Sequence, residues 1–183
     1  MFFGKVGVCL LIFFCLVSVA VPNSMVDRES FEDFYARADR IMVRYHRSLK
    51  YNKERRELLK RSIIGAGLKY DIDVYLIFSV MGQESGFRNI MGQSGELGYM
   101  QVKRETAEFM HRIYRDPIPK DIEDALENSV PYNIDRGVAY LKYLRDTYSA
   151  DDKWMLVLYN VGHGRVDWYA KPIIERAEEL RGG

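Results

Sequence analysis

The sequence predicts a mainly α fold, a helical bundle into which one small glycine-rich hairpin or loop is inserted. Apolar residues recur at three- and four-residue spacing along most of the chain, which is the period of helices that bury one face. This period stops between Gly86 and Gly98, where repeated glycines favour turns over helix. With 183 residues, 48% of them hydrophobic and 29% charged, the chain is long enough for one domain with a real core.

Three helices are expected before the glycine-rich stretch. The first spans about 30–47, with Ser30 as its N-cap, and the second spans about 53–69. The third begins near 71 or 73 and ends at Glu84. The insertion therefore follows directly on Glu84.

Helical patterns resume after the insertion. They cover about 103–114, then 121–128 beyond a pair of prolines, and a longer stretch at about 133–148. A further helix is expected from 151 or 152 to 159, and Pro172 is expected to open a last short helix.

Residues 1–20 have the pattern of an export segment. A sixteen-residue run without any charged residue follows Lys5, and small residues precede a plausible cleavage point after Ala20. An uncleaved membrane anchor is the alternative, because this run falls just short of the roughly 17–25 residues of a spanning helix. In either case we expect an exported protein, with residues 21–52 as an N-terminal helical extension and 53–183 as the main domain.

Charge and cysteine content exclude several classes of function. The chain has 27 Lys+Arg against 26 Asp+Glu, so it lacks the basic excess typical of nucleic-acid binding. Both cysteines, Cys9 and Cys15, lie in the export segment, so the mature domain has no disulfide and no Cys-based metal site. His46, His111 and His163 share no metal-ligand spacing. We expect no metal and no cofactor.

Glu84 is the first candidate for chemistry. It ends an apolar helix and precedes the glycine-rich loop, so its carboxyl group is expected to be desolvated. Desolvation raises the pKa of a carboxyl group and lets a glutamate act as a general acid near neutral pH. An ordinary solvated glutamate at a helix end is the alternative, and the position of Glu84 alone favours that alternative.

Four short motifs surround Glu84 and follow it in the chain. They are Glu84-Ser85-Gly86-Phe87; Gly95-Glu96-Leu97-Gly98-Tyr99-Met100-Gln101; Asn133-Ile134 with Gly137 and Tyr140-Leu141; and Tyr159-Asn160-Val161-Gly162. In this order and spacing, the motifs resemble the catalytic domain of the soluble-type lytic transglycosylases, relatives of goose-type lysozyme. The resemblance spans about 60–169 and implies an α+β, lysozyme-like fold.

The resemblance implies cleavage of the β-1,4 bond between N-acetylmuramic acid and N-acetylglucosamine in peptidoglycan. Glu84 matches the single catalytic acid of the family, and attack by the muramyl 6-hydroxyl would leave a 1,6-anhydro end, as in a carbon–oxygen lyase. The expected partners are peptidoglycan glycan strands in the periplasm or cell envelope, with an envelope-spanning apparatus as a further candidate. No nucleic-acid partner is expected. Contact with a membrane is expected only through the N-terminal segment, and only if that segment is uncleaved.

The resemblance also implies substrate contacts. Tyr99, Met100 and Gln101 match the substrate-facing strand, although for Met100 packing in the core is an equal alternative. Tyr159 matches a tyrosine near the acid, where its hydroxyl would orient the carboxyl group, and Asn160 lies beside it. Three residues of the third motif are expected to be structural: Asn133 as a helix cap, Gly137 for close packing and Tyr140 in the core.

The chain departs from the family pattern at three positions. Gly92 stands where a sugar-contacting serine is common, and Ser94 is a nearby substitute. Glu96 stands where alanine is common, and His163 where proline is common. Glu96 could act as a second carboxylate and activate water, although a solvated loop glutamate is the more frequent case.

Two other functions remain open at this point. A hydrolytic muramidase on the same fold would leave reducing muramic ends and no anhydro ends. A non-catalytic peptidoglycan-binding or assembly protein would keep the fold, but it would not require the acid.

Overall fold

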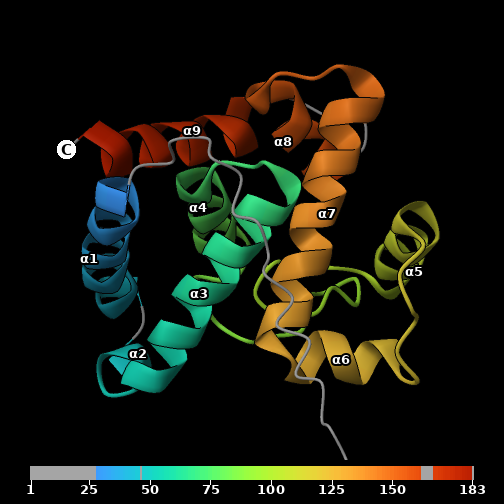
Figure 1. The fold of residues 1–183 in the computed structure, drawn as a ribbon, viewed down its shortest axis with the longest axis horizontal. Helices are drawn as coiled ribbons and strands as arrows, with labels where there is room; N and C mark the ends of the chain where they lie inside the picture. The colour runs from blue at the N-terminus through green and yellow to red at the C-terminus, as the bar shows by residue number, and fades with distance from the viewer. Residues whose placement is uncertain (1–27, 46, 162–166, 183) are drawn as a thin grey trace, which may run out of the picture.

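The computed structural model describes residues 28–45, 47–161 and 167–182. The described part contains nine helices and no β-sheet, and the helices pack around one core (Figure 1). The helices are α1 (Arg28–Tyr45), α2 (Arg47–Lys50), α3 (Lys53–Tyr70), α4 (Val74–Glu84), α5 (Arg104–Tyr114), α6 (Ile122–Asn128), α7 (Val130–Tyr148), α8 (Asp152–Val161) and α9 (Asp167–Gly182). The predicted mainly α fold is confirmed.

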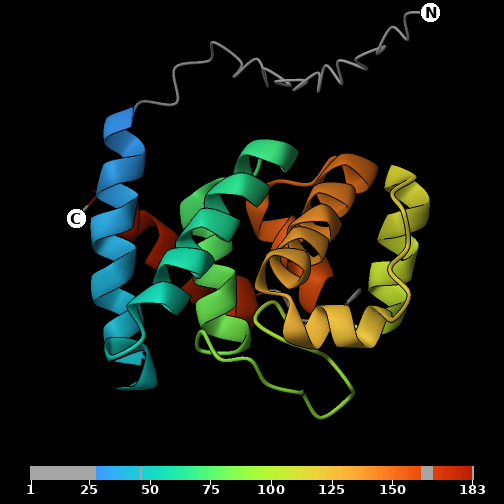
Figure 2. The same ribbon diagram turned by 60° about the horizontal axis from the view of Figure 1, so that its bottom comes forward.

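The glycine-rich insertion is an irregular loop between α4 and α5. It runs along the bottom of the bundle in the view of Figure 2. Two isolated antiparallel bridges, Met91 with Leu97 and Leu97 with Val102, hold it together. The loop is therefore a folded part of the molecule, attached to the end of the helix that carries Glu84.

Three helix starts differ from the sequence prediction. Helix α1 already includes Arg28, so Ser30 lies inside the helix and is not its cap. Helix α7 begins at Val130, because the Ser129 side chain accepts a hydrogen bond from the Tyr132 N–H and caps the helix three residues earlier than expected. Pro172 does not open α9 but lies inside it. Helix α9 tolerates the proline at the cost of one internal hydrogen bond.

Helix α4 lies at the centre of the bundle. Nine successive residues from Val74 to Gly82 are buried, as expected for a helix that is apolar on all sides. Helices α3 and α9 pack against it, and Asp73 caps its start by accepting hydrogen bonds from the N–H groups of Tyr75 and Leu76. The rigid core thus fixes the position of Glu84, the last residue of α4.

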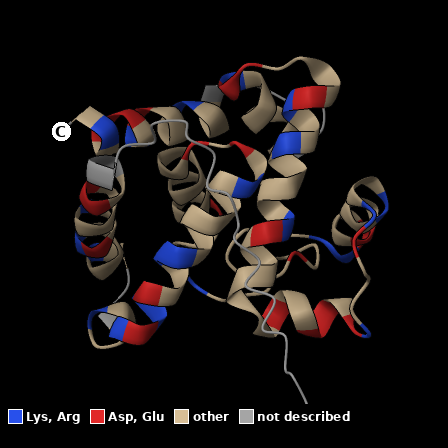
Figure 3. Ribbon diagram, in the orientation of Figure 1, with Lys and Arg blue, Asp and Glu red and all other residues tan. Residues whose placement is uncertain are grey.

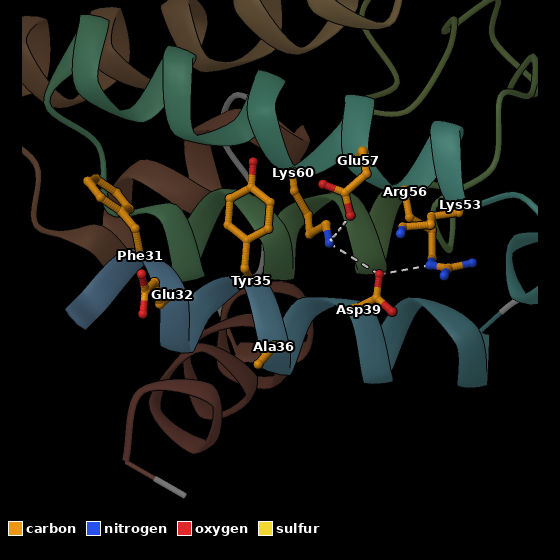
Figure 4. A pocket seen from close by; sticks show the side chains of 9 residues that line it. All are labelled: Phe31, Glu32, Tyr35, Ala36, Asp39, Lys53, Arg56, Glu57 and Lys60. Atoms are coloured by element: carbon orange, nitrogen blue, oxygen red, sulfur yellow. Dashed lines mark hydrogen bonds and ion pairs between the residues drawn. The ribbon is translucent and has the colours of Figure 1, made fainter. Parts of the chain in front are cut away.

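Helix α1 joins the same core through its apolar face and joins α3 through a charged cluster. Phe34, Ala38 and Met42 are fully buried. Beside them lies a pocket of about 630 Å³ between α1 and α3 (Figure 4). Lys60, only 3% exposed, forms ion pairs there with Asp39 (3.2 Å) and Glu57 (2.6 Å). These charges satisfy one another, so the cluster fastens α1 to α3.

Basic and acidic residues are interspersed over most of the helices (Figure 3). Among the helices that the structure describes, none is long and apolar enough to cross a bilayer. The expected export segment, Gly162 of the fourth motif, His46 and His163 lie outside the described residues.

Candidate active site

Glu84 lies at the wall of a cleft of about 400 Å³ formed by α4, the glycine-rich loop, α5, α7 and α8. Burial raises the pKa of the Glu84 carboxyl group above its ordinary value of 4.5, and the negative charge of Glu96 raises it further. A hydrogen bond from Tyr169 opposes this rise without cancelling it. Glu84 therefore has the environment of a general acid that faces a cleft.

Tyr169 is the direct partner of Glu84. Its hydroxyl donates a hydrogen bond to Glu84 Oε1, from a position in α9 that is 85 residues further along the chain. Tyr169 is only 3% exposed, and burial together with the charge of Glu84 raises the pKa of its hydroxyl well above 10.0. The phenol therefore stays protonated and holds one carboxyl oxygen in place. The sequence analysis missed this residue because the contact arises only from the packing of α9 on α4.

Tyr159 has a different role from the one expected. Its hydroxyl donates to the Met100 carbonyl oxygen at 2.8 Å and not to Glu84, which corrects the prediction that it orients the acid. The ring nevertheless lines the cleft, and burial and then the charge of Glu84 raise the pKa of the Tyr159 hydroxyl. Tyr159 thus forms part of the cleft wall and holds the backbone of the loop.

Asn133 holds the same loop from inside α7. This fully buried side chain accepts a hydrogen bond from the Met100 N–H (2.9 Å) and donates to the carbonyl oxygens of Leu97 (2.8 Å) and Leu126 (3.1 Å). It is therefore a clamp for the loop and not the expected helix cap. Gly137 allows the close approach that was expected, since a Cβ atom there would lie 2.6 Å from Met100 Cβ.

Gln101 lines the cleft, and the loop holds its side-chain amide. Its Nε2 donates to the carbonyl oxygens of Ile90 (2.9 Å) and Gly98 (2.7 Å), which uses both of its N–H donors. Its backbone has a φ of 50°, in the left-handed region, so the chain turns sharply at this residue. The loop therefore leaves the amide oxygen as the group that Gln101 can offer to a ligand.

Three expected substrate-binding side chains lie elsewhere. Met100 is fully buried against Gly137, and Tyr99 is 4% exposed, so neither side chain forms the cleft surface. The backbone turns from Gly98 to Gln101, two residues with positive φ, so this segment is not the expected strand in which side chains alternate between core and cleft. Ser94 is exposed, but it is not among the residues that line the cleft. Asn160 does line it.

Glu96 lines the cleft as an ionised group. Burial alone would raise the pKa of its carboxyl group. The carboxylate accepts hydrogen bonds from its own N–H and from the Ser94 N–H (3.0 Å), and it pairs with Lys103 (3.4 Å). These contacts outweigh burial, so the pKa of Glu96 is lowered. A Cβ atom on Gly92 would lie 2.5 Å from Glu96 Oε2 and 2.6 Å from Gln101 Oε1. Two departures from the motif are therefore coupled, because the glycine at 92 makes room for the glutamate at 96.

The sequence analysis also missed part of the cleft wall. Lys103 and Thr106 contribute to it from the start of α5, and Tyr140 contributes from α7. Tyr140 was expected in the core, but it is half-buried. Lys103 and Thr106 could have been predicted from the sequence, because they follow Gln101 by only two and five residues.

Two comparisons with known proteins bear on the family and the fold of this chain. A sequence model described as the transglycosylase SLT domain matches residues 61–178. The fold is similar to that of an inactive mutant of the lytic transglycosylase Slt from Pseudomonas aeruginosa, with a TM-score of 0.52, 23% identity, and coverage of 67% of this chain and 21% of that one. It is also similar to the 70 kDa soluble lytic transglycosylase of Escherichia coli, with a TM-score of 0.50, 23% identity, and coverage of 69% and 21%.

The fold is the mainly α, lysozyme-like fold of these two solved proteins. Because the family match covers most of the chain, the protein belongs to the transglycosylase SLT domain family. The aligned region spans 21% of the length of each of the two solved proteins.

Proposed function

We propose that this protein is a peptidoglycan lytic transglycosylase that cleaves the β-1,4 bond between N-acetylmuramic acid and N-acetylglucosamine and leaves 1,6-anhydromuramyl ends. The observation that carries the proposal is Glu84, a carboxyl group with a raised pKa that faces a cleft and is held by Tyr169. The family membership and the two lytic transglycosylases of similar fold support the same reaction class.

The reaction needs one group that first gives and then takes a proton. Protonated Glu84 donates its proton to the glycosidic oxygen as the bond between that oxygen and the anomeric carbon breaks. The muramyl 6-hydroxyl then attacks the anomeric carbon, and the Glu84 carboxylate accepts the hydroxyl proton. The new bond closes a 1,6-anhydro ring, Glu84 is again protonated, and no water is consumed.

The remaining cleft residues bind and position the glycan. The amide oxygen of Gln101 accepts hydrogen bonds from sugar hydroxyl or acetamido N–H groups, and Asn160 and Thr106 supply further polar contacts along the wall. Burial keeps the pKa of Glu84 raised, and the charge of Glu96 adds to this effect, so the protonated acid is favoured before the bond breaks. Tyr169, which is not among the residues that line the cleft, positions the acid through its hydrogen bond.

Hydrolysis is a second candidate, and one observation favours it. Glu96 is a second, ionised carboxylate in the same cleft, and glycosidases that consume water use two carboxyl groups. In that reaction Glu96 would activate a water molecule on the far side of the anomeric carbon, and the product would carry a reducing muramic end.

The products decide between these reactions. Purified peptidoglycan is digested with the protein in water enriched in ¹⁸O, and the muropeptides are analysed by mass spectrometry, with Glu84→Gln as the control. The proposal predicts ends that are lighter by one water and carry no ¹⁸O. Reducing ends that carry ¹⁸O would overturn it in favour of hydrolysis, and an absence of cleavage would favour a binding protein.

We also propose that residues 1–20 direct export of the chain, and that the protein acts on peptidoglycan outside the cytoplasmic membrane. The uncharged run after Lys5 supports this proposal. N-terminal sequencing of the protein recovered from the periplasm tests it. A chain that starts at Val21 is expected, and a chain that starts at Met1 would contradict cleavage.

A further inference from the structure

Two side chains pack on the last turn of α4, the turn that carries Glu84. Gly82 lies in this turn, and a Cβ atom on it would lie 2.9 Å from Arg176 Nη1 and 3.3 Å from Phe87 Cζ. Arg176 comes from α9, and Phe87 comes from the loop that follows Glu84. The glycine therefore leaves room for a guanidinium group and an aromatic ring two residues before the candidate acid.

Arg176 also binds the backbone of α4. Its Nη1 donates a hydrogen bond of 3.1 Å to the carbonyl oxygen of Ser79. Arg176 follows Tyr169 by seven residues, so the two side chains leave α9 on the same face, two turns apart. Arg176 and Tyr169 are thus two points at which one face of α9 is attached to α4, and the second of these points is Glu84 itself.

Tyr45, the last residue of α1, lies on both Arg176 and Phe87. The Arg176 guanidinium carbon is 5.4 Å from the centre of the Tyr45 ring, which is within the range of a cation–π contact. The Tyr45 and Phe87 rings pack edge to face, with centroids 5.2 Å apart and an interplanar angle of 87°. We call Tyr45, Phe87 and Arg176 the Arg176 cluster.

The Arg176 cluster joins two parts of the chain that the sequence analysis kept separate. Helix α1 belongs to the expected N-terminal extension and precedes residues 61–178, which match the family model. Helices α1, α4 and α9 nevertheless lie against one another (Figure 1). One of the three members of the cluster therefore comes from outside the family domain.

We propose that Arg176 and Tyr45 are positioning residues for the proposed acid, and that the N-terminal extension contributes to cleavage through Tyr45. Arg176 keeps α9 in register on α4, and Tyr45 holds the Arg176 guanidinium in place. Neither side chain is among the described residues that line the cleft, so both act through the bond between Tyr169 and Glu84. The inference rests on the proposed function, because it concerns the acid of that reaction.

The expected consequence is a loss of turnover with little loss of substrate binding. The bond between Tyr169 and Glu84 connects two helices, so it persists only while α9 and α4 keep their relative position. A misplacement of about 1 Å at a reacting group can lower a rate roughly 10²-fold. The cleft walls formed by the loop, α5, α7 and α8 do not depend on the Arg176 cluster, so KM should change little.

The test measures kcat and KM on a soluble glycan, together with the melting temperature, in variants of the full chain. Tyr45→Leu removes the ring at a position that is 40% exposed, and Arg176→Gln removes the guanidinium group. Tyr45→Phe is the conservative variant, because it keeps the ring. Arg181→Gln is the matched control, since it makes the same change in α9, but Arg181 pairs with Asp73 at the opposite end of α4 from Glu84.

We expect kcat to fall roughly tenfold in Tyr45→Leu and in Arg176→Gln, with KM nearly unchanged. Tyr45→Phe should have the wild-type kcat, and Arg181→Gln should lower the melting temperature without lowering kcat. The inference is overturned if Arg181→Gln lowers kcat as much as Arg176→Gln, if Tyr45→Phe is as slow as Tyr45→Leu, or if Tyr45→Leu and Arg176→Gln both keep the wild-type kcat. If the wild-type protein cleaves no glycan, the proposed function fails and this inference fails with it.

A double-mutant cycle tests whether Arg176 acts through Tyr169. In the Tyr169→Phe background the hydrogen bond to Glu84 is already absent, so Arg176→Gln should lower kcat by less than about twofold there. A further loss as large as the loss in the wild-type background would show that Arg176 acts by another route and would overturn the inference.

Discussion

The hydroxyl of Tyr169 in α9 donates a hydrogen bond to the carboxyl group of Glu84 at the end of α4. The bond joins the candidate acid to α9. This helix is the last that the structure describes, and it packs on α4 more extensively than any other described helix. A carboxyl group held in this way has one fixed oxygen, which leaves the other oxygen to face the cleft. Positioning of this kind is worth orders of magnitude in a proton-transfer step.

The first prediction separates the two tyrosines near Glu84. Tyr169→Phe removes a hydrogen bond that stabilises the charged carboxylate, so the pKa of Glu84 should rise further and the alkaline limb of kcat/KM should move to higher pH. Turnover should fall roughly ten- to hundredfold, because the acid is no longer aligned. A pH–rate profile on soluble glycan measures both effects.

Tyr159→Phe is the matched control for that experiment. It removes one hydroxyl from a neighbouring ring, but that hydroxyl bonds to the Met100 carbonyl oxygen. We expect a loss of about 0.5–1.5 kcal/mol in stability and no movement of the alkaline limb. If the alkaline limb of kcat/KM moved in Tyr159→Phe and stayed in place in Tyr169→Phe, the roles assigned to the two tyrosines would be reversed.

The second prediction concerns the charge of Glu96. Its repulsion contributes to the raised pKa of Glu84, so Glu96→Gln should lower that pKa and move the alkaline limb of kcat/KM to lower pH. Glu178→Gln makes the same change of charge at an exposed site on α9 and should leave the limb in place. The account of the cleft electrostatics fails if the two variants have identical profiles.

The third prediction tests the coupling of Gly92 with Glu96. Gly92→Ser places a side chain where Glu96 Oε2 and Gln101 Oε1 already lie, so it should lower kcat/KM roughly tenfold. In the Glu96→Ala background the same serine should lower kcat/KM much less, because the Glu96 carboxylate no longer occupies the space of the new side chain. A double-mutant cycle measures this difference, and additive effects would show that the two positions are independent.

The sequence predicted the helices well where one face is apolar. The expected spans of α3, α5 and α6 agree with the structure to within one residue at each end, because amphipathic period and caps such as Asp121 act locally. Helix α7 begins at Val130, earlier than the expected 133, because Ser129 caps it and Pro131 is tolerated in its first turn. A proline in the first turn lacks only an N–H that has no helical partner there.

The candidate site was predictable only in part. Glu84, Gln101, Tyr159 and Asn160 do line one cleft. The buried positions of Tyr99 and Met100 accompany the turn from Gly98 to Gln101, and the contact of Tyr169 depends on how α9 packs on α4. Local spacing carries no information on either, because both follow from tertiary packing.

The fourth prediction concerns the support of the loop. Gly137→Ala would bring a Cβ atom to 2.6 Å from Met100 Cβ, so it should destabilise the protein by roughly 1–3 kcal/mol and displace Gln101. Gly65→Ala is the control, because in the middle of α3 no atom beyond its chain neighbours and the backbone of its own helix lies within 4 Å of the added methyl group. That variant should be more stable by about 0.5–1 kcal/mol. Thermal unfolding of both variants measures the contrast, and equal effects would contradict the close packing at Gly137.

The role of Glu84 as acid and base is tested most directly by the rate of glycan cleavage in Glu84→Gln, measured together with its melting temperature. The glutamine keeps the size of the side chain and can still accept the Tyr169 hydrogen bond, but it has no proton to transfer. Turnover should fall by roughly 10²–10⁴-fold. Because burial raises the pKa of Glu84, its charge destabilises the fold above that pKa, so the variant should melt at or above the wild-type temperature at neutral pH. The gap should close as the pH falls below the ordinary value of 4.5, where both side chains are neutral. A stable Glu84→Gln protein that cleaves glycan at a near-normal rate would contradict the account.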